Sequence, residues 1–382
     1  MLERKEIQEI ASNYDKDVTI GVLGSHSAEE VGIAAKTFGF PTVVICQKGR
    51  DKFYTKHNSH LFDHTIVLDK FSDIVKDDVQ GKLKKMNTIF IPNRSFSVYV
   101  GYDAIENSFK IPMYGSRSLL RAEERNEKRN QYWLLEKAGI RIPKKFNSPA
   151  EIDRLVIVKV QQKHRPNERA FFYCNSNEEF KTKSKELIEK DIINKTDLEK
   201  ARIEEFVLGQ KFNANFHGWA LKNIADFDFL GFDERKQTNL HGILSLPAKE
   251  QMELDVPIIN EEVGHSGLTM RESQKPLIYE AAEKFRDTCE KEFPPGIFGL
   301  FALQGALAYN GNKLDFFVFD VSPRVPGAPA VGPTSPEMRR LTLKYSELLK
   351  SFDMEKIETP MDLTMLEIKY AIKNNAIDDV VT

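Results

Sequence analysis

Short runs of β-branched and aromatic residues alternate with polar segments along the first 115 residues of this chain. Buried parallel strands are typically short and rich in valine and isoleucine. Such runs predict four strands, over 18–23, 42–46, 64–68 and 88–91. After the first run, apolar residues recur at helical spacing and predict a helix over 28–38, ended by Gly39 and Pro41. This alternation is typical of a doubly wound, Rossmann-like α/β layer.

The pattern of the remaining residues is mixed and predicts an α+β architecture. Helices are expected over 119–137 and 275–292, with exposed, Lys/Glu-rich helices within 178–202. Further strands are predicted over 155–160, 170–174, 203–207, 212–219, 224–232, 298–303 and 314–321. A chain of 382 residues exceeds the size of one hydrophobic core. We expect three domains, over 1–118, 119–206 and 207–382.

Composition narrows the class of protein. The chain is 41% hydrophobic and 29% charged with a net charge of −2, as in an ordinary soluble globular protein, and it lacks the basic excess of a nucleic-acid-binding protein. Its three cysteines, Cys46, Cys174 and Cys289, are widely spaced, which favours buried free thiols over disulfides or zinc. No membrane-spanning run or signal sequence is evident, so we expect a cytoplasmic protein with no membrane partner.

Two polar turns follow predicted parallel strands. Gly24-Ser25-His26-Ser27 comes after the first strand, and Pro92-Asn93-Arg94-Ser95-Phe96 comes after the fourth. Ligands of open α/β sheets bind beyond the carboxyl ends of the strands, and a helix N-terminus attracts anions. The turns therefore predict a pocket for a phosphorylated small molecule, although ordinary strand-to-helix turns would also explain them. The first turn lacks the Gly-x-Gly-x-x-Gly motif of dinucleotide-binding sites, so the sequence does not favour a dinucleotide ligand.

Polar residues inside later strands suggest a second ligand. Lys159 has apolar neighbours, so its ammonium group needs an anionic partner or an edge position facing solvent. The segment 203–207 can offer acceptors and backbone groups to a purine ring. Gln304 and Asp320 follow aromatic-rich runs, and oxygen ligands on two strands are typical of Mg²⁺ sites that bridge nucleotide phosphates. Arg324 follows in a proline-rich loop, where it can contact phosphate.

The order of these features resembles an ATP-grasp enzyme, and several stretches resemble one family in particular. These are Gly24-Ser25-His26-Ser27-Ala28 and residues 46–50, 92–96, 134–143, 231–242, 246–249, 271–273 and 294–296. They are similar to the archaeal FAICAR synthetases, which formylate the nucleotide AICAR with formate and ATP in purine biosynthesis. The resemblance runs over almost the whole chain. It implies an ATP-grasp fold with an N-terminal Rossmann-like preATP-grasp domain.

The resemblance also implies roles for single residues. His26, Ser95 and Asn239 match the positions that hold the nucleotide monophosphate, and His26 is also a candidate catalytic residue. Lys159 matches the ATP-grasp lysine, Glu204, Glu205 and Val207 lie in the segment that matches the adenine hinge, and Gln304 and Asp320 match the metal-ligand positions. Lys211 and Arg324 differ from the family pattern, and we expect Lys211 to face the ribose or a phosphate of ATP and Arg324 to act as a second catalytic residue. The implied co-substrates are ATP and formate, with Mg²⁺ or Mn²⁺ as cofactor. The resemblance further implies a homo-oligomer.

Several positions depart from the family pattern. The loop after Lys159, residues 161–169, contains no glycine, whereas the family has a glycine-rich loop that covers phosphate. Lys211 stands where the family has an acid for the ribose, and Asp320 replaces a longer glutamate. These departures leave two alternatives beside the leading hypothesis. One is a related ligase that joins another carboxylate and amine, and the other is a catalytically weak nucleotide-binding regulatory protein.

Overall fold

The computed structural model describes residues 2–14, 17–161, 169–254, 256, 261–327 and 335–382. The chain forms two compact units, described one at a time below. The first comprises residues 1–138, 212–304 and 320–382, and the second comprises 139–211 and 305–319. The three-domain division remains a prediction.

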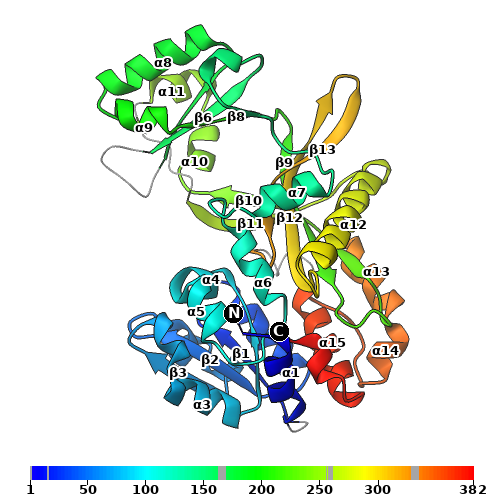
Figure 1. The fold of residues 1–382 in the computed structure, drawn as a ribbon. Coiled ribbons are helices and arrows are strands. Elements are labelled where there is room, and N and C mark those ends of the chain that lie inside the picture. Colours follow the sequence, from blue (N-terminus) through cyan, green and yellow to red (C-terminus); the bar gives the residue numbers. More distant parts are fainter. Residues whose placement is uncertain (1, 15–16, 162–168, 255, 257–260, 328–334) are drawn as a thin grey trace. The chain divides into compact units, whose positions relative to one another are not determined.

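A parallel four-stranded sheet lies at the start of the first unit (Figure 1). Its order is β3-β2-β1-β4, formed by β1 (Thr19–Leu23), β2 (Thr42–Gln47), β3 (His64–Leu68) and β4 (Thr88–Ile91). Strand β1 is fully buried and pairs in parallel with both β2 and β4. Helix α2 (Ala28–Thr37) follows β1. The four predicted strands and the predicted helix are confirmed.

Helices cover this sheet, and one of them comes from the far end of the chain. The amino-terminal ones are α1 (Arg4–Ser12), α3 (Asp77–Lys85), α4 (Arg94–Val100) and α5 (Tyr102–Asn107). From the far end of the chain comes α15 (Pro360–Lys373), whereas α13 (Pro336–Lys344), which is followed by α14 (Ser346–Lys350), packs against β10 (Phe227–Gln237) of a second sheet. Helix α15 packs against α2, and its apolar residues share one core with those of β1 and α2. The two ends of the chain therefore stabilise the same sheet.

A second, five-stranded sheet has the order β11-β10-β9-β12-β13. Its strands are β9 (Gln210–Gly218), β10 (Phe227–Gln237), β11 (Glu262–Leu268), β12 (Gly299–Asn310) and β13 (Lys313–Ser322). The predicted helix over 275–292 is confirmed as α12 (Lys275–Glu292). The rings of Phe216, Phe229 and Phe301 pack together on this sheet, with Phe216 5.1 Å from Phe301 and 5.4 Å from Phe229. The aromatic residues from which these strands were predicted thus pack together as part of a hydrophobic core.

The second unit contains a small antiparallel sheet of order β5-β8-β6-β7. It is built from β5 (Lys145–Phe146), β6 (Val156–Gln161), β7 (Arg169–Cys174) and β8 (Arg202–Glu205). Val156, Val158 and Val160 alternate along β6 and are buried with Phe172 and Phe180. The predicted polar helices are α8 (Asn177–Glu189) and α9 (Lys195–Glu199).

The single helix predicted over 119–137 is wrong. The structure has α6 (Arg117–Leu120), a 3-10 turn over 121–123, and then α7 (Gln131–Lys137). Asn130 explains the break, because its side-chain oxygen accepts hydrogen bonds from the backbone N–H groups of Tyr132 and Trp133 and caps α7. Its amide also donates to the carbonyls of Arg125 and Glu127, which holds the preceding turn in a non-helical conformation.

The three cysteines are free and buried, as predicted. In the part of the chain that the structure describes, no helix is both long and apolar enough to cross a membrane.

Candidate functional site

A polar cavity of about 460 Å³ lies within the first unit. Its lining includes five of the residues singled out from the sequence, which are His26, Ser95, Gln304, Asp320 and Arg324. They come from the turn after β1, the start of α4, strands β12 and β13, and the loop after β13. The structure thus brings together residues up to 298 positions apart, between His26 and Arg324.

The two polar turns are tied together by Asn93. Its side-chain oxygen caps α4 by accepting from Phe96 N–H, and its amide donates to the carbonyls of Leu23 and His26 at 3.0 and 2.9 Å. The Ser95 hydroxyl donates to the Ser25 hydroxyl at 2.7 Å. The strand ends therefore fix the positions of His26 and Ser95 in one cavity, while their role in binding a monophosphate remains a prediction.

His26 faces several cations. Burial lowers the pKa of the His26 imidazole, and the positive charges of Arg324, His265 and Arg235 act in the same direction, whereas Glu262 opposes them. The imidazole is therefore neutral near pH 7 and able to accept a proton or a hydrogen bond.

A buried hydrogen-bond network on β9, β10 and β11 forms one wall of the cavity. Asp233 is fully buried, and its carboxylate accepts hydrogen bonds from the amides of Asn213 and Asn215, both at 2.6 Å. His265 Nδ1 lies 2.6 Å from the same carboxylate, and its Nε2 lies 2.9 Å from Glu262 Oε1. Both nitrogens of the His265 ring thus face carboxylates, which favours the imidazolium form.

The charge on His265 makes stability depend on pH. Burial alone would lower the pKa of His265, but hydrogen bonds to Asp233 and Glu262 raise it to about 9. Because this pKa is higher in the folded protein than in the unfolded chain, where it is near 6.5, protonation of His265 stabilises the folded state. The stabilisation is present in full below about pH 6.5. This stabilisation is lost as the pH rises through about 9.

We expect His265→Asn to lower the free energy of unfolding by about 1–3 kcal/mol more at pH 6 than at pH 10. Urea unfolding of both proteins across this range measures the difference. A difference that does not change with pH would contradict a charged His265.

Gln304 and Asp320 are the candidate metal ligands, and both line this cavity. The Gln304 amide oxygen accepts from Arg235 at 3.3 Å, and the Asp320 carboxylate lies 3.7 Å from Arg125. Among the described residues, no cluster of three or more His, Cys, Asp or Glu side chains could hold a metal ion. One carboxylate and one amide oxygen fit a Mg²⁺ ion that takes its other ligands from phosphates and water.

Arg324 is buried and paired. Its guanidinium donates to both oxygens of Glu123, at 2.6 and 3.3 Å, in the bidentate geometry that arginine and carboxylate favour. Arg94 also lies 3.3 Å from Glu123. Arg94 also donates to Glu124 at 3.1 Å, so two guanidinium groups and two carboxylates form an ion-pair network at the cavity wall. The planar guanidinium groups are donors that suit phosphate.

The remaining ATP-binding candidates belong to the second unit. Lys159 on β6 donates to Glu204 on the neighbouring strand β8 at 2.6 Å, so its anionic partner is Glu204. Glu205 pairs with Arg154 at 3.3 Å, while Val207 is buried in a small apolar cluster. Lys211 lies 5.3 Å from the centre of the Phe206 ring. Burial, and then the charge of Lys159, lowers the pKa of Lys211.

Asn239 is placed elsewhere in the first unit. It lies in the turn between β10 and α10 (Leu240–Leu244), with a φ of 39°, and is not among the described residues that line the polar cavity. The glycine-free loop falls largely within 162–168, outside the described residues.

Sequence reasoning assigned no role to the network around Asp233. The sequence does contain one sign of this network, which is the spacing of its polar residues. Asn213 and Asn215 on β9 are two positions apart, as are Asp233 and Arg235 on β10. Side chains two apart on a strand share one face. A polar face on strands that also carry aromatic core residues such as Phe216 and Phe232 points to a site.

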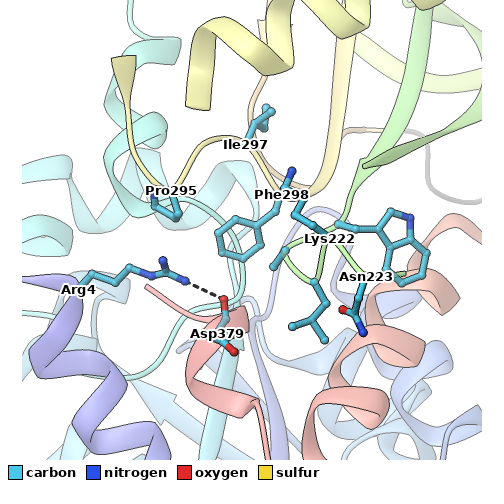
Figure 2. Close-up of a pocket in the computed structure, with 10 residues that line it drawn as sticks. Arg4, Lys222, Asn223, Pro295, Ile297, Phe298 and Asp379 are labelled. Atoms are coloured by element: carbon cyan, nitrogen blue, oxygen red, sulfur yellow. Dashed lines mark hydrogen bonds between the residues drawn. The ribbon is translucent and has the colours of Figure 1, made fainter. Parts of the chain in front are cut away.

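A second cavity, of about 280 Å³, also lies in the first unit (Figure 2). The cavity is lined by Pro295, Ile297 and Phe298, together with Arg4 at the start of α1, Asp379 and the β9–β10 turn. Arg4 points to Asp379 and donates to its carbonyl at 2.7 Å. The predicted site residues that the structure describes do not line this cavity.

Comparisons with solved structures identify the class of fold. The IMP biosynthesis protein PurP from Thermococcus kodakaraensis matches with a TM-score of 0.65 and 23% identity, over 95% of this chain and 100% of that chain. Phosphoribosylglycinamide synthetase from Anaerococcus prevotii matches with a TM-score of 0.53 and 15% identity, over 88% and 75%. The fold is that of the ATP-grasp ligases, as predicted.

Sequence comparisons identify the family. A 5-formaminoimidazole-4-carboxamide-1-(beta)-D-ribofuranosyl 5'-monophosphate synthetase of Methanobrevibacter smithii is 34% identical over 99% of this chain and 98% of its own length. The Methanopyrus kandleri protein of the same name is 38% identical over 86% and 88%. Models of a domain of unknown function, DUF1297, and a protein of unknown function, DUF1246, match residues 179–382 and 20–146. The chain belongs to the family of these synthetases, abbreviated FAICAR synthetases.

Proposed function

We propose that this chain is an ATP-dependent ligase that joins formate to the amine of AICAR, giving FAICAR for purine biosynthesis. One observation supports the proposal above all. A single cavity in a member of the FAICAR synthetase family holds the candidate nucleotide contacts His26 and Ser95 together with Gln304, Asp320 and Arg324. A pocket with a neutral imidazole, the buried guanidinium group of Arg324 and a carboxylate suits a phosphorylated substrate and an acyl phosphate.

The reaction requires two transfers and no nucleophilic side chain. A formate oxygen attacks the γ-phosphorus of ATP, giving formyl phosphate and ADP. The AICAR amine then attacks the formyl carbon, the bond between that carbon and the phosphate oxygen breaks, and phosphate leaves. His26 is the candidate acceptor for the proton that the amine loses, because its imidazole is neutral.

The protein's main contribution is charge and position. Arg324 and Arg94 line the cavity and would present guanidinium donors where phosphate charge develops during the transfer, while Glu123 holds both side chains in position. Asp320 and Gln304 would hold Mg²⁺ or Mn²⁺, which when bound would neutralise phosphate charge. Holding the amine and the acyl phosphate next to each other in one cavity would further raise the rate of the second transfer. The proposal places this activity in the cytoplasm and in a homo-oligomer.

Incubating the purified protein with AICAR, formate and Mg-ATP is expected to yield ADP and FAICAR in equal amounts. Replacing His26 by alanine is expected to weaken AICAR binding by about 1–3 kcal/mol through loss of a hydrogen bond to a charged group. His60→Ala, which changes an exposed histidine of the same unit, is the control. Unchanged AICAR affinity in the His26 variant would remove this residue from the nucleotide site.

The position of Lys211 predicts poor discrimination between ATP and dATP. A lysine has no acceptor for a ribose hydroxyl, and Lys211 carries its ammonium group over Phe206. Binding that depends on lysine charge is also weakened by salt. Calorimetric titration with ATP and dATP at low and high salt is expected to give similar, weak and salt-sensitive affinities. Tight, salt-insensitive ATP binding with rejection of dATP would contradict this prediction.

A further inference from the structure

The Glu262 carboxylate lies between two cationic side chains at the edge of the polar cavity. Its Oε1 is 2.9 Å from His265 Nε2, and its Oε2 is 3.0 Å from Arg235 Nε. Each carboxylate oxygen therefore has its own charged donor. A pair of donors with this spacing accommodates a planar anion with two oxygens, which is the shape of any small carboxylate.

The two donors are held in place by the sheet, independently of Glu262. His265 and Arg235 are directly paired residues on the antiparallel strands β11 and β10. His265 Nδ1 is anchored by the buried Asp233, and Arg235 Nη2 donates to Gln304 at 3.3 Å. The side chains of Arg235 and Glu262 are 40% and 32% exposed, and Glu262 begins the edge strand β11. Each donor thus has a second partner besides Glu262, and the carboxylate between them is accessible to solvent.

The candidate proton acceptor lies beside this pair. A side chain at Gly327 would begin only 3.0 Å from both His26 Nε2 and His265 Nε2, and 3.2 Å from Glu262 Oε1. Glycine at 327 thus leaves a space on which these three polar groups converge. An anion held by His265 and Arg235 would have the His26 imidazole next to it.

We infer that His265 and Arg235 form the subsite for the small carboxylate substrate, and that Glu262 occupies this subsite until the substrate replaces it. The inference rests on the proposed function only in naming formate as that carboxylate. Exchange of one carboxylate for another keeps the charges of His265, Arg235 and Asp233 balanced. Substrate entry therefore leaves both His265 Nε2 and Arg235 Nε with a carboxylate partner.

An internal competitor reduces the apparent affinity for the external ligand. If Glu262 leaves the pair free about one-tenth of the time, the apparent Kd for formate is about tenfold higher than its intrinsic value. Removing the competing charge should therefore tighten formate binding by up to roughly that factor. The same change should leave the affinity for AICAR unaltered.

The test measures formate binding by NMR titration of ¹³C-formate, in the absence of ATP and AICAR. We expect Glu262→Gln and Glu262→Ala to lower the Kd for formate, and Arg235→Gln to raise it. Glu261→Gln removes the same charge from the adjacent, exposed residue and is the matched control. Chloride is titrated in parallel as a spherical anion, and thermal unfolding is recorded for every variant.

Tighter formate binding in both folded Glu262 variants, with no change in Glu261→Gln, would support the inference. Weaker or unchanged formate binding in those variants would overturn it, as would an equal gain for chloride, which would reflect charge alone. The titration needs no turnover, so its outcome is separate from that of the FAICAR assay. Formate binding that responds to Glu262 without FAICAR formation would overturn the proposed function but retain the subsite.

Discussion

Replacing Asp320 by asparagine is expected to lower turnover by about 10²–10³-fold, the effect of removing one group that stabilises transition-state charge. Asp320 is the only carboxylate of the candidate metal pair with Gln304, so the variant keeps the size of the side chain but loses the negative charge. The measurement is the rate of ADP formation as a function of Mg²⁺ concentration, with AICAR and formate saturating. The variant should require more Mg²⁺ as well as turning over more slowly.

Asp315→Asn is the control for this prediction. Asp315 lies on the same strand, β13, and is paired loosely with Arg141 at 4.0 Å. Removing its charge should leave the rate and the Mg²⁺ dependence nearly unchanged. Wild-type, Mg²⁺-dependent turnover in the Asp320 variant would show that this carboxylate is not a metal ligand.

The amino-terminal sheet could be predicted because its signals are local. Strands β1 and β4 are continuous buried runs, although the edge strand β3 is mostly exposed, and Gly39 and Pro41 follow the end of α2. The polar residues after β1 and β4 could be expected to meet because parallel strands end at one edge. The meeting of His26 with Gln304, Asp320 and Arg324 depends instead on contacts between distant parts of the chain, which no local pattern reveals.

The network around Asp233 was missed because it depends on the pairing of strands that are distant in the sequence. Asp233 could equally have been a polar residue on a solvent-facing strand, since alternation alone does not say which face is buried. Only the pairing of β10 with β9 and β11 places Asn213, Asn215 and His265 around it. The break at Asn130 was missed for a similar reason, because a strong N-cap within a charged, helix-forming stretch is easily read as a surface residue.

The network also carries the largest expected effect on stability. Replacing Asp233 by asparagine is expected to lower the free energy of unfolding by about 3–5 kcal/mol, because a buried ion pair loses one partner. Three donors from Asn213, Asn215 and His265 now converge on two carboxylate oxygens of a fully buried side chain. An amide offers one oxygen and turns an N–H group toward at least one of these donors, which leaves it unsatisfied.

Urea unfolding of the variant measures this loss, and Asp226→Asn is the matched control. Asp226 is an exposed aspartate 3.5 Å from Arg286, so removing its charge should cost at most about 1 kcal/mol. The double variant Asp233→Asn, His265→Asn should lose less than the sum of the two single variants, because the cation and its counter-charge are removed together. If Asp233→Asn costs no more than Asp226→Asn, or if the two single effects simply add, then Asp233 and His265 do not act as a buried pair. The anchoring of His265 as a donor in the cavity would then have to come from Glu262 alone.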